Sequence, residues 1–382
     1  MGAVVTVARR LIVAALLLHS VLLQPPGAAS VSPRARDGVA PVTAPLHVSD
    51  LTFVDARHGW AVGSLCGATG TCVPALRATH DGGQTWQALP VPPLLLTSTT
   101  STVRQVHFAT TQDGWLFGPT LSATHDGGQT WTQDRRVRGV VALATAGRSV
   151  WVLSRSCAPF RPCQSRLVVS RDAGRTWRWA ATPPPLQPGV VQLLHPSARV
   201  GWIAATALLV GTHDGGRTWT RLTDPCAADS TLGPFGQQFA AHGNRTLWAL
   251  CGGEPSAGQQ NKSVYVSGDG GRHWALTATT CFPWTRPLRG GCGRVPGSGY
   301  VSGLALSTPT HGWMVLQRGT LYGSHDGGHT WYPAIPYAQA NGSDAGIGPM
   351  VFVDAQHGWL GALGRVFHTT DGGAAWRAVL LR

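Results

Sequence analysis

The chain has 382 residues, of which 43% are hydrophobic and 12% charged, and 30 basic against 17 acidic residues give a formal net charge of +13. That length is enough for two domains, and the positive charge favours an acidic protein, an anionic glycan or an anionic envelope polymer as partner. The basic residues are dispersed and no nucleic-acid-binding motif is present, which argues against nucleic acid. Signatures for zinc proteases, serine hydrolases and phosphate loops are absent, so we predict no metal and no cofactor.

The N-terminus has the pattern of an export signal. Arg9 and Arg10 precede an apolar run at 11–23, and small residues follow it. We expect residues 1–29 to be a cleaved signal peptide and residues 30–46 to be a flexible leader. The apolar run is short for a bilayer span, although an uncleaved anchor remains the alternative. The predicted location is therefore extracytoplasmic, either secreted or in the cell envelope, without a stable membrane span.

From residue 47 onward one motif, Ser/Thr-x-Asp-x-Gly-x-x-Trp, occurs seven times. Two of its purest copies read THDGGQTW, at 79–86 and 124–131. A second tryptophan precedes every copy, and short alternating apolar runs flank both tryptophans. Repeats of about 40–50 residues made of short strands and glycine turns are typical of propeller blades. The seven motif aspartates are Asp81, Asp126, Asp172, Asp214, Asp269, Asp326 and Asp371.

Each repeat predicts four short strands, A to D, with the motif as the turn between C and D. The aspartate can accept hydrogen bonds from backbone N–H groups of its own turn, and glycine can supply the positive φ that a tight turn needs. We therefore predict an all-β fold, a single seven-bladed β-propeller of four-stranded antiparallel blades over 47–382, with structural aspartates. Both terminal blades have all four strands, so strand exchange is not required, and residues 41–48 are a candidate addition to the last blade. The predicted blades are 47–98, 99–139, 140–187, 188–236, 237–297, 298–346 and 347–382.

The motif resembles the Asp-box, or BNR, repeat, over nearly the whole chain after the leader. The combination of F-V-D-x-x-H-G-W, as at 53–60 and 352–359, with S/T-x-D-G-G-x-T-W most resembles the photosystem II stability and assembly-factor-like propellers. This resemblance implies a non-catalytic module that binds proteins or acts as an assembly scaffold. The same boxes occur in sialidases, xyloglucanases and sortilin-type receptors, and a fold does not determine an activity. A glycoside hydrolase and a carbohydrate-binding adhesin are therefore the alternatives.

The residues do not match a sialidase-like site well. Such a site needs an arginine cluster, a tyrosine nucleophile, a glutamate and an acid/base carboxyl group, and glycoside hydrolysis needs a spaced pair of catalytic groups. Glu254 is the only glutamate, the five tyrosines are all late in the chain, and GRVPG at 293–297 is too late to be the early Arg-Ile-Pro motif. We predict that the chain is not an enzyme.

Eight cysteines in an exported chain predict disulfides. Close spacing favours the pairs Cys66–Cys72, Cys157–Cys163 and Cys281–Cys292, which leaves Cys226–Cys251 by elimination. Zinc binding is the competing interpretation, but there is no repeated Cys-x-x-Cys pattern.

Loop lengths predict which face carries function. The strand-B tryptophan and the box aspartate are 21 residues apart in the first, third and fifth repeats and 11 to 13 apart in the others. The extra residues form B–C inserts at 64–74, 154–166 and 251–263, and the long D–A connections share their face. Function concentrates in such loops, and arginine and aromatic residues are the usual interface anchors. The alternative is that these inserts are only disulfide-stapled decoration on a solvated face. We expect the protein to be a monomer. The candidate partner-binding residues are Arg155, Phe160, Arg161, Arg166, Phe282, Trp284, Arg286, Arg289 and Arg294.

Overall fold

The structure is a computed structural model; the chain divides into two units, and every described residue lies in the second, Val42–Arg382. The predicted signal peptide and nearly all of the predicted leader lie outside the described residues. Among the residues that the structure describes, no helix has the length and apolar character needed to cross a bilayer. The described residues are 46–67, 71–92, 105–118, 120–157, 163–180, 183, 186, 189, 191–229, 232, 235–280, 295–317, 320–335, 347–362 and 365–381.

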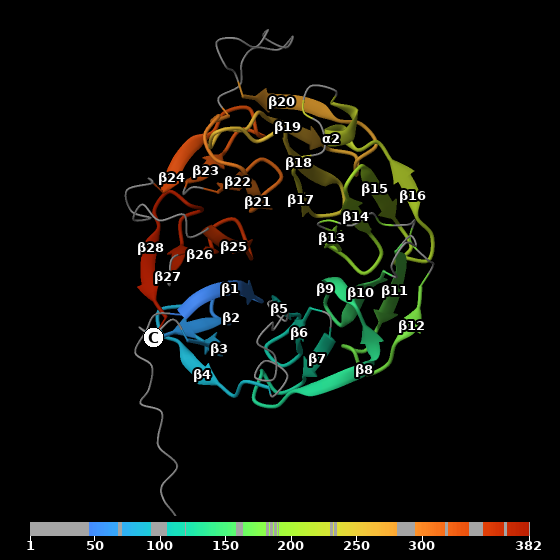
Figure 1. The fold of residues 1–382 in the computed structure, drawn as a ribbon, viewed down its shortest axis with the longest axis vertical. Helices are drawn as coiled ribbons and strands as arrows, with labels where there is room; N and C mark the ends of the chain where they lie inside the picture. Colours follow the sequence, from blue (N-terminus) through green and yellow to red (C-terminus); the bar gives the residue numbers. More distant parts are fainter. Residues whose placement is uncertain are drawn as a thin grey trace, which may run out of the picture. The chain divides into compact units, whose positions relative to one another are not determined.

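The second unit contains seven antiparallel sheets of four consecutive strands each, arranged in a ring (Figure 1), so the predicted fold is confirmed. Blade 1 is β1 (Leu46–Phe53), β2 (Gly59–Cys66), β3 (Cys72–Thr79) and β4 (Gln87–Leu89); blade 2 is β5 (Gln105–Phe108), β6 (Gly114–Phe117), β7 (Thr120–Thr124) and β8 (Thr132–Arg138); blade 3 is β9 (Val140–Ala146), β10 (Ser149–Ser156), β11 (Gln164–Ser170) and β12 (Arg178–Trp179); blade 4 is β13 (Val191–Leu194), β14 (Gly201–Ala205), β15 (Leu208–Thr212) and β16 (Thr220–Leu222).

The remaining blades follow the same order of strands. Blade 5 is β17 (Gln237–His242), β18 (Thr246–Gly252), β19 (Lys262–Ser267) and β20 (Ala275–Thr279); blade 6 is β21 (Val301–Leu306), β22 (Gly312–Leu316), β23 (Thr320–Ser324) and β24 (Tyr332–Ile335); blade 7 is β25 (Ile347–Phe352), β26 (Gly358–Ala362), β27 (Arg365–Thr369) and β28 (Arg377–Leu380). One short helix, α2 (Pro225–Ala228), lies in the connection between blades 4 and 5.

The innermost strands close the ring without exchanging a strand. Each contacts the innermost strand of the next blade, and β25 contacts β1. The N–H of Leu46 donates to the carbonyl of Leu381 at 3.0 Å, which joins the two ends of the described propeller directly. Because β1 begins at Leu46 and pairs with β2, blade 1 is complete by itself. Residues 41–45 of the candidate extra strand lie outside the described residues.

Tryptophans on the second strand of each blade form the core between blades. All seven are at most 1% exposed. The Trp60 ring stacks on Phe108 of blade 2 with centroids 3.7 Å apart, and its indole Nε1 donates to the Gly127 carbonyl at 2.9 Å. Trp359 makes the equivalent stack on Phe53 of blade 1, so the closing seam uses the same contact as the seam between blades 1 and 2. Stacked aromatic rings stabilise such seams beyond the area that they bury.

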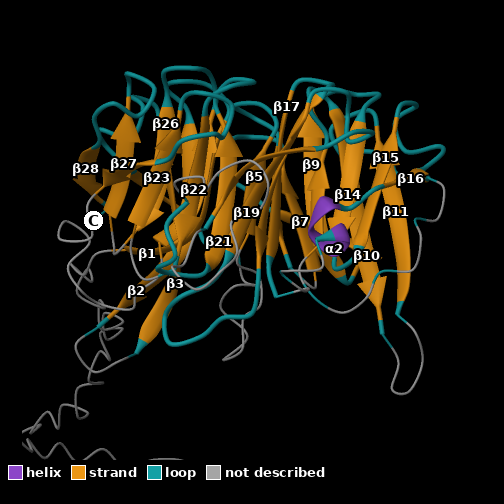
Figure 2. Ribbon diagram, turned by 90° about the horizontal axis from the view of Figure 1, so that it is seen from above, coloured by secondary structure: helices purple, strands orange, loops and turns teal. Residues whose placement is uncertain are grey.

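The turns divide the ring into two faces. In every blade, a residue of the box turn donates its backbone N–H to the turn between the first two strands, as from Gly82 to Arg57 at 2.8 Å. We call the face with these paired turns the box face, and the opposite face, with the B–C and D–A connections, the insert face. Figure 2 shows short turns along one edge of the strands, with α2 toward the other.

Three of the four predicted disulfides are present. Cys66–Cys72 and Cys157–Cys163 each close a hairpin between the second and third strands of a blade, and Cys226–Cys251 ties α2 to β18. No free cysteine remains among the described residues. Cys281 and Cys292 lie outside them.

Candidate functional site

The box aspartates serve their own turns. In blade 2, Thr124 donates its hydroxyl to Asp126 Oδ1 at 2.7 Å, and the N–H of Gly128 donates to Thr124 Oγ1 at 2.9 Å. Hydrogen bonds from the hydroxyl and the N–H of Thr130 lower the pKa of Asp126 to about 2. Two hydrogen bonds to the aspartate carboxylate recur in all seven boxes. The Ser or Thr two residues before the aspartate donates its hydroxyl, and the residue four positions after the aspartate donates its backbone N–H. A carboxylate held ionised by such bonds is suited to a turn and not to proton transfer.

The box face is uniform in backbone but not in side chains. Three equivalent positions in every blade face solvent there: three residues before the strand-B tryptophan, one before the box aspartate, and three after it. Arginine fills seven of these nine positions in blades 3–5 but only one, Arg57, of the twelve in the other blades. We call the seven residues the arginine arc, and all are exposed. They are Arg148, Arg171, Arg175, Arg199, Arg217, Arg245 and Arg272.

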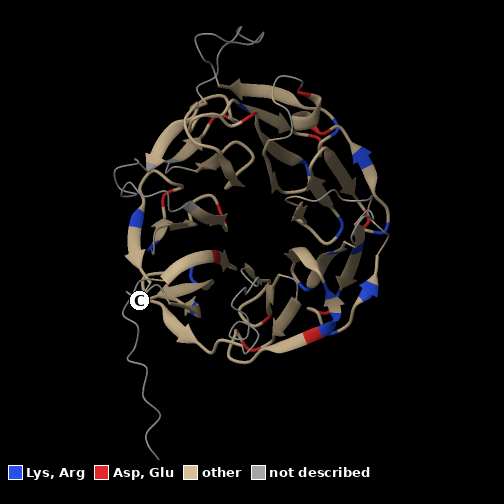
Figure 3. Cartoon of the chain, in the orientation of Figure 1, with Lys and Arg blue, Asp and Glu red and all other residues tan. Residues whose placement is uncertain are grey.

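Figure 3 shows more blue along blades 3 to 5, from β9 to β20, than along blades 6 and 7, from β21 to β28. In blades 3–5 the acidic residues of the box face are the box aspartates Asp172, Asp214 and Asp269. Seven guanidinium groups therefore outnumber three carboxylates that are already engaged in turns. Such a surface attracts and orients anionic groups.

Arg171 joins two blades within the arc. Its Nη1 donates to the hydroxyl of Ser149 at 3.0 Å and to the carbonyl of Ala198 in blade 4 at 3.1 Å. Its guanidinium carbon lies 5.2 Å from the centroid of the Trp151 ring, a cation–π contact. Burial, and then the positive charge of Arg217, lower the pKa of Arg171. The two guanidinium groups are thus close enough to repel each other, and a bound anion would relieve that repulsion.

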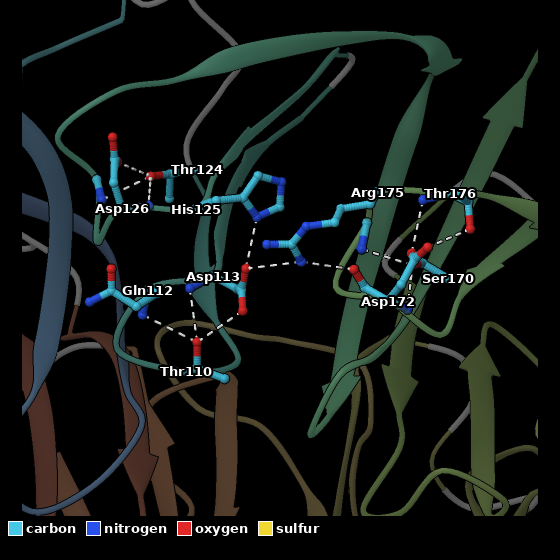
Figure 4. A network of polar contacts seen from close by, with 12 residues as sticks. Thr110, Gln112, Asp113, Thr124, His125, Asp126, Ser170, Asp172, Arg175 and Thr176 are labelled. Carbon is cyan, nitrogen blue, oxygen red and sulfur yellow. Dashed lines mark hydrogen bonds and ion pairs between the residues drawn. The ribbon is translucent and has the colours of Figure 1, made fainter.

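Arg175 fixes the edge of the arc to blade 2 (Figure 4). Its Nη1 lies 3.7 Å from Asp113 Oδ1, which also contacts His125 Nδ1 at 2.7 Å. The same Nη1 donates to the Asp172 carbonyl at 3.1 Å. Asp113 occupies the position that His58 occupies in blade 1. Because blade 2 has an aspartate here and not a histidine, a carboxylate at this seam attracts Arg175 toward blade 2.

On the insert face, the structure describes two of the nine predicted partner-binding residues. Arg155 and Arg166 line one pocket of about 260 Å³ together with Arg136 and Arg138 of β8. The other seven predicted residues lie outside the described part of the chain: Phe160, Arg161, Phe282, Trp284, Arg286, Arg289 and Arg294. The prediction that these nine residues form one binding surface therefore stays a prediction.

Two described carboxyl groups have the raised pKa that a general acid needs. Burial raises the pKa of Asp50, in β1, to about 7, against hydrogen bonds from Val106 and Leu51 that lower it. Burial also raises the pKa of Asp224, which caps α2. They belong to blade 1 and to the connection between blades 4 and 5 and do not form a pair. Among the described residues, no group of three metal-ligating side chains occurs.

The profile of the photosynthesis system II assembly factor YCF48 matches residues 39–180 and 294–382, more than half of the chain. The chain belongs to the YCF48 family. This result confirms the resemblance inferred from the two tryptophan motifs. Within a YCF48-like propeller, blades 1–3 and 6–7 are thus the parts most like the family, while blades 4 and 5 fall outside the matched residues.

Individual relatives agree with this assignment. The chain is 28% identical over 169 residues to the photosystem II assembly protein Ycf48 of Synechococcus sp. (strain JA-3-3Ab), a match that covers 39% of this chain and 49% of that protein. The matched region thus spans about half the length of that curated relative.

Solved structures show a similar fold. A YCF48 bound to a D1 peptide has a TM-score of 0.55 at 22% identity, over 86% of this chain and 95% of that chain. The YCF48 of Cyanidioschyzon merolae has a TM-score of 0.57 at 15% identity, over 88% and 98%. An ancestral GH74 enzyme has a TM-score of 0.61 at 12% identity, over 88% of this chain and 47% of the enzyme. At these identities the likeness concerns the fold alone.

Sequence reasoning missed residues on both faces of this YCF48-family propeller. The arc escapes notice because its arginines are 4 to 28 residues apart, and only an alignment of equivalent blade positions brings them together. Arg136 and Arg138 had a local signal, the basic run DRRVR at 134–138 directly after a box. Trp179 also had one, because it is one of two tryptophans outside the repeat.

Proposed function

We propose that this chain is a non-catalytic, exported propeller that assists assembly by binding an acidic segment of a partner protein on its box face. The observation that carries the proposal is the arginine arc, because one scaffold presents the same three positions in seven blades, and seven of the eight arginines at these positions lie in three consecutive blades. Turn geometry does not require arginine there, since glutamine, histidine and alanine occupy the same positions elsewhere. A contiguous choice of one residue type points to a ligand.

Guanidinium groups suit carboxylates because they form two parallel hydrogen bonds to one acid group. Several such groups on a rigid surface also speed association, and that effect weakens as salt is added. An acidic peptide lying across blades 3–5 would contact several arc residues in turn. The Arg171–Arg217 repulsion would fall when such a peptide binds.

Two further observations support a protein partner and an extracytoplasmic setting. A YCF48 propeller of similar fold has been solved bound to a D1 peptide. The apolar run at 11–23 and the three disulfides favour export, because disulfides persist in oxidising compartments. We expect the mature protein to act as a monomer.

Affinity capture from the envelope fraction of the source organism tests this proposal. The triple variant Arg199→Glu, Arg217→Glu and Arg272→Glu should lose the partner and keep its melting temperature. Arg57→Glu is the matched control, because Arg57 holds the position of Arg199 on a blade outside the arc, and it should capture the partner normally. Capture by wild-type protein should also weaken as salt rises.

The insert face provides the competing outcome. If Arg161→Glu, Arg289→Glu and Arg294→Glu together abolish capture while the arc variant captures normally, the partner binds the insert face and the arc proposal is wrong. Loss in both triple variants with unchanged melting temperatures would mean that the partner spans both faces.

A glycoside hydrolase is the second candidate. The likeness in fold to a GH74 enzyme and the raised pKa of Asp50 favour it, but hydrolysis needs two carboxyl groups about 5–10 Å apart. Hydrolysis of a panel of plant and bacterial glycans by the wild type, lost in Asp50→Asn, would replace the assembly role with an enzymatic one.

A further inference from the structure

The pocket between blades 2 and 3 combines four guanidinium groups with an exposed indole. Arg136 and Arg138 enter from β8, and Arg155 and Arg166 from the β10–β11 hairpin. Trp179 of β12 also lines it and is 66% exposed. The guanidinium carbon of Arg166 lies 5.5 Å from the centroid of that indole. Arg136 is paired with Asp134, but the four guanidinium groups still give this small space a net positive charge, which favours an anion there.

An irregularity in β8 builds one wall of this pocket. In the pairing of β7 with β8, Leu121 lies opposite Asp134 and the adjacent Thr120 lies opposite Arg138. Residues 135–137 are therefore extra residues without cross-strand partners, and they bulge from the ladder. Bulges re-aim side chains and are frequent beside functional sites.

Asp134 holds the bulge and Arg136 in place. Its Oδ1 accepts the N–H of Arg136 at 2.9 Å and the Nε of Arg136 at 3.0 Å, while its Oδ2 accepts Nη2 at 2.6 Å. The same Oδ2 accepts the indole Nε1 of Trp177 at 2.7 Å. In blades 1, 2 and 6 the box tryptophan donates within its own box instead, as Trp86 does to Gly83. Trp177 of blade 3 therefore helps Asp134 to orient Arg136 of blade 2 in the pocket.

The lining matches a sugar that carries an acidic group. Guanidinium forks bind a carboxylate or a sulfate by paired hydrogen bonds. The negative face of an indole attracts the C–H edge of a ring that lies on it, and Ser154, Ser156 and Gln164 add donors and acceptors for hydroxyl groups. The volume of about 260 Å³ is below the roughly 300–1,000 Å³ of pockets for drug-sized ligands, so it fits a single sugar ring.

We propose that this pocket binds one residue of an acidic saccharide, with the arginines on its acidic group and Trp179 against its ring. The site differs from the arginine arc in both location and ligand, so it goes beyond the partner binding proposed above. It would attach the propeller to an anionic glycan or envelope polymer while the box face stays available to a protein.

Titration calorimetry with an oligoglucuronate tests the proposal, with an oligoglucose of equal length and inorganic sulfate as comparison ligands. The wild type should bind the oligoglucuronate at least about tenfold more tightly than either comparison ligand. Arg166→Ala and Trp179→Ala should each weaken that binding by about tenfold or more. Trp179→Ala should not change sulfate binding, because sulfate has no ring. Arg178→Ala is the matched control, since Arg178 is exposed on the same strand but does not line the pocket, and it should bind like the wild type.

Equal affinity for oligoglucuronate and sulfate would reduce the site to a simple anion site and overturn the proposal. So would unchanged oligoglucuronate binding in both Arg166→Ala and Trp179→Ala, or competition between oligoglucuronate and an acidic peptide at this pocket. The arc variant Arg199→Glu, Arg217→Glu and Arg272→Glu should bind the saccharide normally, which separates this proposal from the one for the box face.

Discussion

The indole Nε1 of Trp359 donates to the carbonyl of Gly82 at 2.8 Å, across 277 positions of sequence. The same indole stacks on Phe53 with ring centroids 3.7 Å apart. Blade 7 is therefore joined to blade 1 by side chains and by the backbone hydrogen bond from Leu46 to Leu381. The seam that closes the ring carries the same stack and indole hydrogen bond as the seam between blades 1 and 2, where Trp60 stacks on Phe108 and donates to Gly127.

Replacing this tryptophan tests how much the closing seam contributes. We expect Trp359→Phe to lower the free energy of unfolding by about 2 kcal/mol, from one lost hydrogen bond and a small cavity. The melting temperature in differential scanning calorimetry should fall by several degrees. Trp179→Phe, at an exposed position, is the control and should leave it unchanged. Equal melting temperatures for both variants would show that the ring does not depend on this contact.

His195 occupies a core position where blades 1, 2 and 7 have phenylalanine. Its ring stacks on Trp151 with centroids 3.9 Å apart, as Phe108 stacks on Trp60, but neither ring nitrogen has a hydrogen-bond partner. We expect His195→Phe to raise the melting temperature at pH 7, because an unsatisfied buried polar group costs about 1–3 kcal/mol. Thermal unfolding of both proteins measures the difference.

The gain from His195→Phe should grow in acid. Burial lowers the pKa of His195 to about 3 in the folded protein, while the unfolded chain titrates near the ordinary value of about 6.5. Between these values the unfolded state binds the extra proton, so the wild type loses stability as pH falls from about 6.5 toward 3. If the variant exceeds the wild type in melting temperature by the same amount at pH 7 and pH 4, this account is contradicted.

Lys262, the only lysine of the chain, should resist amine reagents. Its side chain is 0% exposed, and its ammonium donates to the carbonyls of Gln260 and Pro296 at 2.9 Å, with Gly297 and Ser298 slightly farther away. Acetylation mapped by mass spectrometry should label it only after unfolding. Labelling of the native protein as fast as in denaturant would refute this burial.

Removing that ammonium should destabilise blade 5. We expect Lys262→Met to lower the free energy of unfolding by about 2–4 kcal/mol, because several buried carbonyls lose a charged donor. Burial lowers the pKa of Lys262 to about 8, so between pH 8 and the ordinary value of about 10.4 the unfolded chain binds the extra proton. The wild type should therefore gain stability over that interval as pH rises, and Lys262→Met should not. Chemical denaturation at pH 7.5 and pH 10 provides the comparison.

Asp50→Asn should stabilise the protein at alkaline pH. Burial raises the pKa of Asp50 to about 7, so the folded state holds its proton between about pH 4 and 7 while the unfolded state has released it. The wild type therefore loses stability as pH rises through this interval. An asparagine can still accept the Val106 N–H, as Gln192 accepts that of Phe239 at 2.8 Å. The melting temperature of the variant minus that of the wild type should increase from pH 4 to pH 8. A decrease over this range would contradict the raised pKa of Asp50.

The fold could be predicted from the sequence because its signals are local. The bonds that shape a box join residues at most four positions apart, as among Thr124, Asp126 and Thr130. Seven such turns, each following a strand-B tryptophan, leave little choice except a ring of seven blades. The same locality explains the hairpin disulfides Cys66–Cys72 and Cys157–Cys163, whose partners face each other across one turn.

Only the tertiary structure decided which side chains act together, because those contacts cross from one blade to the next. Arg171 and Arg217 are neighbours through the seam of blades 3 and 4, and Trp177 orients Arg136 through Asp134 although 43 residues separate Trp177 from Asp134. His195, which directly follows β13, becomes a core residue because Trp151 of the preceding blade stacks on it. These contacts cannot be found along the chain, because the repeats vary in length. They form only when the ring closes and every blade packs against two others.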